Sequence, residues 1–326
     1  MAEPRSSARV PEVVRVPPER RAEAAERLVN VPEEERRSAA LRLVASASGH
    51  GIDLDLCWAT TDPVSGRFRE ACLAVIGAGR TAMLFLPHAG EDAHDADRPE
   101  ELAGLIRVAC EEIERRRPMD VRIVQVLPAP EETTTIRALH LAGFVDVGVL
   151  SYLRRSNRGR VVPAAPANWG DGIEVRAFGA TGEHEADEAR TIEALDRSYV
   201  DTLDCPELCG LRETKDVFDS HRATGEWDPS LWWLVFRGAQ PVGCMLFNVC
   251  RGPSSVELVY FGLAPELRGR GLGSRLLAFG LAGVRGTDAA EIACAVDTRN
   301  TPAMRLYRRA GFRPFAKRAA MVRPAR

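Results

Sequence analysis

The chain of 326 residues has 45% hydrophobic and 28% charged side chains, with 44 Lys and Arg against 46 Asp and Glu. This length favours two domains of ordinary size, and the composition excludes a disordered chain, a collagen-like repeat and a small disulfide scaffold. The near-neutral charge excludes the basic surface of a nucleic-acid-binding protein, and no apolar run approaches the roughly 18 residues of a membrane span.

The N-terminal segment, residues 1–21, is rich in Pro, Arg and Glu and lacks the apolar core of a signal peptide. We therefore expect a cytoplasmic protein whose partners include neither nucleic acid nor membrane. The eight cysteines form no CxxC pair, and most lie in apolar runs such as those around Cys244 and Cys294. Such thiols behave as small hydrophobes, so we expect reduced cysteines inside the domain cores.

The first half, residues 1–155, is typical of one α/β domain. Apolar or alternating runs predict strands, and apolar residues at helical spacing predict helices. In chain order these patterns predict strands at 54–60, 67–77 and 80–87, a helix at 99–117, a strand at 121–127, a helix at 133–143 and a closing strand at 144–155.

Residues 156–172 are rich in Pro, Gly, Asn and Ala and predict an interdomain linker, followed by a second domain at 173–326. The second domain should form a mixed β-sheet flanked by helices. Its predicted elements are a strand at 173–178, a helix at 185–200, a short helix within 202–229, a hairpin at 231–249 that turns at 237–241, a strand at 254–266, a helix at 271–286, a strand at 291–297, a helix at 301–311 and a strand at 312–322.

The two halves share a pattern near their ends. The segment RALHLAGF at 137–144 lies 168 residues before RLYRRAGF at 305–312. The first half repeats the later part of the second-half plan, which indicates an internal duplication of a whole domain and not a short solenoid repeat.

An anion-binding loop is predicted where the strand before residue 264 runs into RGRGLG, residues 268–273, followed at once by an apolar helix. Backbone N–H groups at a helix N-terminus attract anions, and glycines let phosphate oxygens approach the backbone. Arg268 and Arg270 can add charge-assisted hydrogen bonds. An ordinary Gly-rich turn is the alternative, and a dinucleotide-binding fold fits poorly because Arg268 stands where the first Gly belongs.

A second segment at 297–312, DTRNTPAMRLYRRAGF, completes a pair of motifs. Together they resemble the GCN5-related N-acetyltransferase (GNAT) superfamily, whose phosphate loop Q/R-x-x-G-x-G/A is matched by Arg268, Gly271 and Gly273. The family's last helix, N-x-x-A-x-x-L-Y-x-x-x-G-F, is matched by Asn300, Ala303, Leu306, Tyr307, Gly311 and Phe312. The resemblance covers residues 173–321 and, with the duplication, implies an α/β fold of two tandem GNAT-like domains.

The resemblance implies acetyl-CoA as co-substrate and no metal. In the family the fourth and fifth strands, here 256–263 and 291–297, splay apart around pantetheine. On that pattern Phe261, Gly262 and Leu263 contact pantetheine, the Leu263 N–H polarises the thioester carbonyl, and Asn300 and Tyr307 contact the CoA arm. The pyrophosphate would lie on Arg268, Gly269, Arg270, Gly271, Leu272, Gly273 and Ser274.

Acyl transfer to an amine requires a free amine and a protonated leaving thiolate. The resemblance implies that Tyr307 is the general acid for the thiolate, with simple packing of an aromatic ring as the alternative. Many family members place a base on the fourth strand, where Glu257 lies. Two-residue periodicity puts Glu257 on the face of Val259, Phe261 and Leu263, although a carboxylate at a strand edge is equally consistent.

Substrate contacts in the family come from the loop between the first two helices, here about 199–210. Asp201, Asp204 and Glu207 suit a cationic amine, unless this is only a solvated acidic loop. Cys205 and Cys209 lie in the same loop, but no histidine or second cysteine pair accompanies them, so we predict no metal site.

The first copy has lost the anion-binding pattern. Its matching loop contains four carboxylates, which repel a pyrophosphate: Glu91, Asp92, Asp95 and Asp97. The position of Tyr307 is taken by Leu139, which has no proton to give. We therefore interpret residues 1–155 as a degenerate GNAT-like domain without catalysis of its own.

The chain is thus expected to be an acetyl-CoA-dependent N-acetyltransferase that acts by direct attack in a ternary complex, similar in architecture to two-copy bacterial acetyltransferases of the mycothiol synthase type. The expected acceptor is a small-molecule amine. A protein α-amine or lysine and a non-catalytic acyl-CoA-binding sensor are the alternatives. Because two copies in one chain can replace a dimer, we expect a monomer or a weak homodimer.

Overall fold

Two units divide the chain, and their boundary differs from the one predicted. The computed structural model describes residues 12–87, 98–117, 119–158, 168–250 and 254–325. One unit comprises Met1–Asp146 with Met321–Arg326, and the other Val147–Ala320. Of the predicted linker, residues 159–167 lie outside the described residues. None of the described helices is long and apolar enough to cross a membrane.

The first unit contains every element predicted for the first half except most of the closing strand, and three more elements at its beginning. Its sheet runs in the order β1, β2, β3, β4, β5 and then the last residues of β12. Up to the closing strand of the first copy, its elements are β1 (Val13–Arg15), α1 (Arg21–Leu28), α2 (Glu33–Ser46), β2 (Cys57–Thr61), β3 (Phe68–Gly77), β4 (Thr81–Phe85), α3 (Arg98–Arg116), β5 (Ile123–Val126), α4 (Thr133–Leu141) and β6 (Val145–Ser156).

The second unit confirms the predicted mixed sheet. Its strands follow the order β6, β11, β10, β9, β8, β7. After β6 its elements are β7 (Ile173–Ala177), α5 (His184–Tyr199), α6 (Thr214–Ala223), β8 (Trp232–Arg237), β9 (Gln240–Cys250), β10 (Ser255–Leu263), α7 (Leu272–Gly283), β11 (Glu291–Asp297), α8 (Thr301–Arg309) and β12 (Arg313–Pro324).

The duplication extends over the whole length of each copy, because both follow the order β-α-α-β-β-β-α-β-α-β. The last helices, α4 and α8, begin 168 residues apart and have the same length. Each ends at a glycine with positive φ, 86° at Gly143 and 90° at Gly311. The phenylalanine that follows each glycine is buried, so the two copies end their last helices in the same way.

The copies exchange their closing strands. Leu150–Ser156 of β6, from the first copy, pair antiparallel with β11 in the second unit. Met321–Pro324 of β12, from the second copy, pair antiparallel with β5 in the first unit. The strand predicted to close the first domain therefore completes the sheet of the second unit instead.

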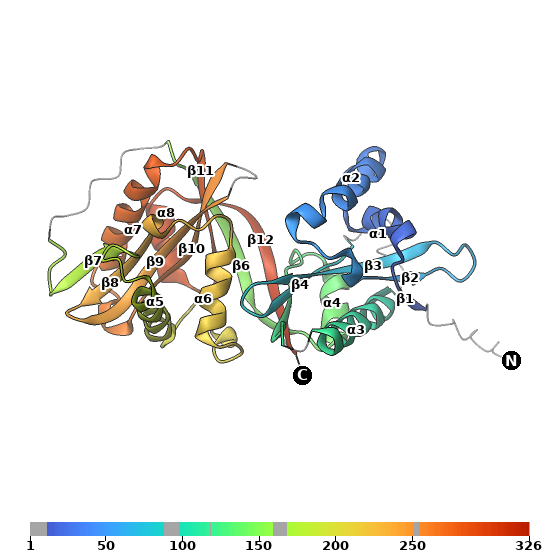
Figure 1. Ribbon diagram of the computed structural model, residues 1–326, viewed down its shortest axis with the longest axis horizontal. Helices are drawn as coiled ribbons and strands as arrows, with labels where there is room; N and C mark the ends of the chain where they lie inside the picture. The colour runs from blue at the N-terminus through green and yellow to red at the C-terminus, as the bar shows by residue number, and fades with distance from the viewer. Residues whose placement is uncertain (1–11, 88–97, 118, 159–167, 251–253, 326) are drawn as a thin grey trace. The chain divides into compact units, whose positions relative to one another are not determined.

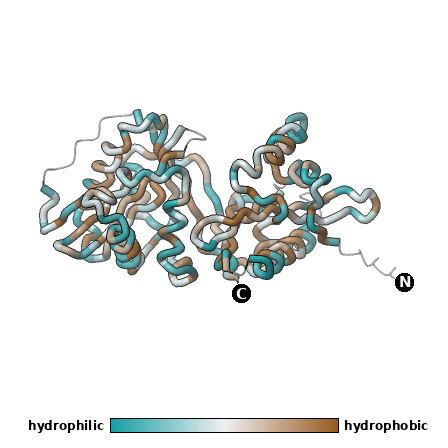
Figure 2. Tube along the Cα trace, viewed as in Figure 1, coloured by the Kyte–Doolittle hydropathy of each residue, from teal (hydrophilic) through white to brown (hydrophobic). Residues whose placement is uncertain are grey.

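Both faces of the second unit's sheet are covered by helices, which can be followed in Figure 1. On one face α7 and α8 pack against Met245 and Phe247, and on the other α5 and α6 pack against Trp232 and Leu246. All four of these side chains are fully buried. Figure 2 shows hydrophobic residues concentrated along the central strands, as expected for a sheet buried on both sides.

His221 on α6 makes the stability of this unit sensitive to acid. Its Nε2 atom is buried and has no hydrogen-bond partner among the residues that the structure describes, and its ring lies 5.3 Å from the ring of Tyr260. Burial, and then the charge of Arg212, lower the pKa of His221 to about 4. The imidazole of His221 therefore stays neutral in the folded protein at pH values near 6.5 and below, where the unfolded chain already binds a proton.

Stability from neutral His221 is present above about pH 6.5 and is lost as the pH falls toward 4. Between pH 7.5 and pH 4.5, we expect the free energy of unfolding to fall by roughly 2 to 3 kcal/mol less in His221→Gln than in the wild type. Urea unfolding at the two pH values measures it, with exposed His184→Gln as the control. Equal losses in all three proteins would contradict the assignment.

Candidate active site

An opening lies between two strands in the middle of the second unit's sheet. β10 and β11 pair in parallel only at Ser255–Glu257 and Glu291–Ala293. Beyond that point β11 continues to pair with β6, while β10 pairs only with β9 among the described strands. The strands thus splay in the way that the resemblance implies, and the far half of β10 presents unpaired backbone groups to the opening.

A β-bulge in β10 corrects the predicted face of Glu257. The register with β9 passes from Leu258↔Phe247 to Tyr260↔Leu246, which leaves Val259 unpaired. An extra residue reverses the alternation of side chains. Glu257 therefore shares the α5/α6 face with its partner Asn248, whereas Phe261 and Leu263 pack on the opposite face, toward α7.

The end of β10 directs one backbone N–H into the opening. The Ala264 N–H donates to the Val242 oxygen of β9 at 2.8 Å. Because successive N–H groups of a strand point to opposite sides, the Leu263 N–H points away from β9. Gly262 has no space for a side chain, since a Cβ there would lie 2.5 Å from the Tyr260 hydroxyl oxygen.

Arg268 does not present its side chain for a phosphate. Its guanidinium donates to three backbone oxygens, those of Leu263 at 2.9 Å, Asp201 at 2.9 Å and Ser198 at 2.8 Å. Its own N–H donates to Pro265. The predicted phosphate contact of Arg268 is therefore wrong for its side chain, which joins the end of β10 to the end of α5.

The rest of the glycine loop has the geometry of an anion site. Gly269 and Gly271 have φ angles of 74° and 78°, and Gly271 is the N-cap of α7 without any side-chain cap. The first N–H groups of α7 therefore have no acceptor within the helix. Arg270 and Ser274 are exposed, whereas the Leu272 side chain is buried in the core and can offer only its backbone.

Helix α8 borders this site on the α7 side. Asn300 caps it by accepting from the Ala303 N–H at 3.2 Å. The nearest atoms to a Cβ placed on Gly273 would be the Leu306 Cδ2 at 3.9 Å and the Phe261 Cζ at 4.0 Å. The glycine loop, the end of β10 and α8 thus meet at Gly273.

Tyr307 is only 6% exposed and packs edge-to-face on Phe312, with ring centroids 5.6 Å apart. Burial raises the pKa of Tyr307 far above its usual range, and the nearby Cys294 and Asp204 add to the effect. The phenol therefore keeps its proton at every physiological pH.

Glu257 is half-buried at the point where the strands separate. Burial raises the pKa of its carboxyl group. The Cys250 Sγ lies 4.0 Å from its Oε2. A carboxylate of raised pKa can accept a proton at neutral pH.

The three acidic residues predicted to bind the acceptor differ in their contacts and exposure. Glu207 forms a bidentate ion pair with Arg299, at 2.6 and 2.8 Å. Asp204 is an exposed residue whose carboxylate accepts from the Asp297 N–H at 2.7 Å. Asp201 is exposed and has a φ of 51°. The structure thus does not place the three together as a free cation-binding cluster.

Sequence reasoning missed Asp297 and Arg299, which bind this loop to the end of β11. Both residues lie within the three positions before Asn300, but nothing in their spacing identifies Glu207, 92 positions from Arg299, as a partner. Within the described parts of the chain, no cluster of three side chains suited to a metal ion is found. All eight cysteines are free and six of them are buried, which confirms the predicted core thiols.

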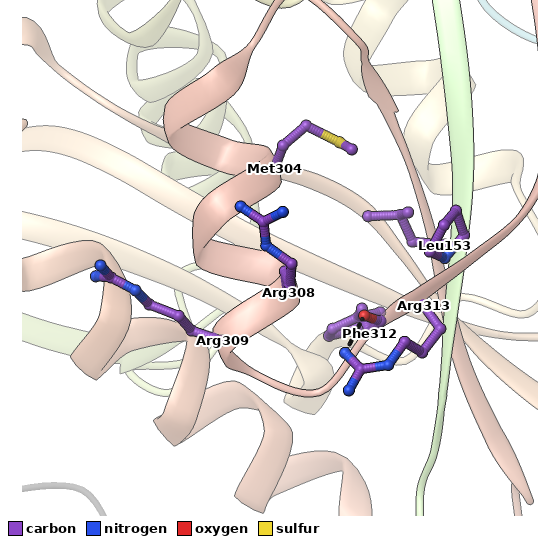
Figure 3. Close-up of a pocket in the computed structure, with 7 residues that line it drawn as sticks. Leu153, Met304, Arg308, Arg309, Phe312 and Arg313 are labelled. Atoms are coloured by element: carbon purple, nitrogen blue, oxygen red, sulfur yellow. Dashed lines mark hydrogen bonds between the residues drawn. The ribbon is translucent and has the colours of Figure 1, made fainter.

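A surface pocket of about 470 Å³ lies beside α8 (Figure 3). Its lining residues are Leu153, Met304, Arg308, Arg309, Phe312, Arg313 and Pro314. Met304 extends toward Leu153 of β6 in Figure 3, whereas Leu306 of the same helix lies near Gly273. This pocket is therefore separate from the opening between β10 and β11.

In the first copy, the protein's own carboxylates gather near the N-terminus of α3. Buried Arg98 pairs with buried Glu70 at 2.5 Å, and buried Glu101 accepts from the Thr60 hydroxyl and pairs with Arg69. Leu139 is fully buried at the position equivalent to Tyr307. The four predicted repelling carboxylates, Glu91, Asp92, Asp95 and Asp97, lie outside the described residues.

Comparison with known proteins agrees with this geometry. Residues 197–312 match the sequence model of the acetyltransferase (GNAT) family. A mycothiol acetyltransferase of Gordonia bronchialis is 30% identical over 144 residues, 39% of this chain and 46% of that protein. Another, from Geodermatophilus obscurus, is 28% identical over 221 residues, 62% of each chain. The chain thus spans between about half and three fifths of the length of these relatives.

Among solved structures, a GCN5-related N-acetyltransferase from Sphaerobacter thermophilus matches with a TM-score of 0.60. The match covers 96% of both chains at 22% sequence identity. At that identity the match concerns the fold alone, and it includes both copies.

Proposed function

We propose that the chain is a tandem GNAT protein and that it transfers an acetyl group from acetyl-CoA to a primary amine. One observation carries the proposal. The unpaired edge of β10 leads directly into a helix N-terminus preceded by two glycines of positive φ. An extended thioester arm can pair with the edge of β10, and a pyrophosphate can bind the N-terminus of α7.

The proposed contacts follow from the geometry. The backbone of Phe261 and Gly262 pairs with pantetheine, and the Leu263 N–H polarises the thioester carbonyl. The N–H groups of 269–274 bind the pyrophosphate, and Asn300 contacts the CoA arm through its amide nitrogen.

In the proposed reaction the amine nitrogen attacks the thioester carbonyl carbon, a C–N bond forms and the C–S bond breaks. Tyr307 gives its proton to the departing sulfur, and Glu257, directly or through water, accepts a proton from the amine. Glu257 lies on the α5/α6 face of the sheet and Tyr307 on the α7/α8 face. The two groups therefore approach the opening from opposite sides, with acid and base separated by the reacting atoms.

The acceptor is proposed to be a small molecule with a single amine. Glu207 and Asp297 are both paired with Arg299, so neither of these two carboxylates is free to bind the extra amino groups of a polycation. The relatives named mycothiol acetyltransferase also favour a small-molecule acceptor over a protein.

Release of free thiol from acetyl-CoA, measured against a panel of monoamines, polyamines and N-terminal peptides, tests this function. We expect turnover with a class of monoamines. Release with peptides alone would favour a protein acceptor, and tight CoA binding without turnover on any amine would favour a sensor.

Calorimetric titration tests which copy binds CoA. We expect one CoA per chain, because the second copy has an open helix N-terminus beside the unpaired end of β10, whereas buried Glu70 and Glu101 lie near the N-terminus of α3 in the first copy. Two equivalent sites would contradict the assignment of the first copy as degenerate.

A further inference from the structure

Arg299 lies where three segments of the second unit meet. Its guanidinium donates to Asp297 at the end of β11, with a shortest distance of 2.7 Å, and to both carboxylate oxygens of Glu207 in the acceptor loop. The same side chain donates to the Val147 oxygen at the start of β6, at 2.7 Å. One arginine thus joins the acceptor loop, β11 and the strand contributed by the first copy.

Asp297 bonds the same loop through its backbone. Its carboxylate is fully buried and accepts from the Cys205 N–H at 3.2 Å, while its own N–H donates to Asp204 at 2.7 Å. Burial alone would raise the pKa of Asp297, but the hydrogen bonds from Arg299 outweigh it and the pKa is lowered. The buried carboxylate therefore stays charged, and Arg299 is its counter-ion.

The loop is held in a conformation that it would not readily adopt alone. Asp201 and Cys205 have φ angles of 51° and 45°, which side-chain-bearing residues rarely adopt. Such strained residues persist only where surrounding contacts enforce them. Asp297, Glu207 and Arg299 supply those contacts on the side of β11.

The β6 strand leaves room for this arrangement. A Cβ placed on Gly148 would lie 2.6 Å from the Asp297 Oδ2 and 3.0 Å from an Arg299 nitrogen. Only glycine therefore fits beside the pair. The strand supplied by the first copy thus both completes the sheet and accommodates the Asp297–Arg299 pair.

We propose that the Asp297–Arg299 pair is a latch that fixes the acceptor loop, Asp201–Gly210, against the end of β11. The inference rests on the proposed function, because this loop borders the opening: Asp204 accepts from the Asp297 N–H at the end of β11, and the Asp201 oxygen accepts from Arg268, which also binds the end of β10. Arg299 is a positioning residue in this scheme: it holds the loop that receives the amine and touches neither substrate. The latch gives the degenerate first copy a role in acceptor binding through β6.

The test uses Arg299→Met and Arg299→Lys in the full chain. Lysine keeps a positive charge beside Asp297 but cannot make the bidentate contact with Glu207. The lysine variant therefore remains usable if the methionine variant does not fold. Arg190→Met is the matched control, because Arg190 also joins a fully buried aspartate, Asp187, to an exposed glutamate, Glu183.

The first readout is amide hydrogen exchange of the acceptor loop, which requires no activity. We expect exchange at Asp204–Glu207 to rise at least about tenfold in both Arg299 variants and to stay unchanged in Arg190→Met. Loop protection equal to that of the wild type in both Arg299 variants would overturn the latch.

The second readout separates the latch from the proposed function. We expect the KM for the accepted amine to rise about tenfold, with kcat and the Kd for CoA within about twofold of the wild type. A fall in kcat at constant KM would overturn the positioning role. If the wild type turns over no amine, the proposed function fails, while hydrogen exchange still decides whether the loop is latched.

Discussion

The double substitution Gly269→Ala/Gly271→Ala is expected to weaken CoA binding by at least about tenfold, or ~1.4 kcal/mol. Both glycines have a positive φ, which costs an alanine roughly 1 kcal/mol or more at each position. No atom lies within 4 Å of a Cβ placed on either, so the alanines clash with nothing in the free protein. The new methyl groups lie instead in the open space in which a pyrophosphate would contact the backbone.

A control with the same backbone strain isolates the effect on the ligand. Gly182 and Gly238 also have a positive φ, 78° and 58°, and also have open space at their Cβ positions. Gly182→Ala/Gly238→Ala should therefore lose similar stability but bind CoA like the wild type. Calorimetric titration of both variants decides the matter, and an equal loss of affinity in the two would remove the glycine loop from the proposed site.

Local patterns predicted most of the second copy. The hairpin turn at 237–241, the strand–loop–helix around the glycine loop and the capped helix at 301–309 depend on contacts between near neighbours in the chain, and the structure contains all three. The pattern predicted neither α1 nor α2. In α2, Ala40 is the only buried residue, so the helix carries almost no apolar stripe.

The features that sequence patterns missed depend on long-range pairing. The bulge at Val259 follows from register with β9 and reverses the face of Glu257, which no local alternation reveals. The side chain of Arg268 donates hydrogen bonds to backbone carbonyl groups up to 70 residues away. Its guanidinium is therefore not available for the phosphate contact that the sequence predicted. The exchange of closing strands likewise leaves no local signal, because either sheet presents the same kind of edge to β6.

Replacing Tyr307 by phenylalanine is expected to lower kcat by about 100-fold, because general acids contribute on that scale. The Kd for CoA should stay near the wild-type value, since the contacts proposed for CoA are mainly backbone groups of β10 and the glycine loop. The ring of phenylalanine preserves the packing against Phe312. Thermal stability should therefore stay close to that of the wild type.

A second variant distinguishes proton donation from packing. The first copy places Leu139 at the equivalent position and buries it completely, so leucine is compatible with this kind of helix. Tyr307→Leu should lower kcat as much as Tyr307→Phe while also losing stability from imperfect packing. If kcat instead follows stability, with phenylalanine near the wild type and leucine low, Tyr307 is a packing residue. In that case the proton for the departing thiolate must come from a bound water molecule or from another group that lines the opening.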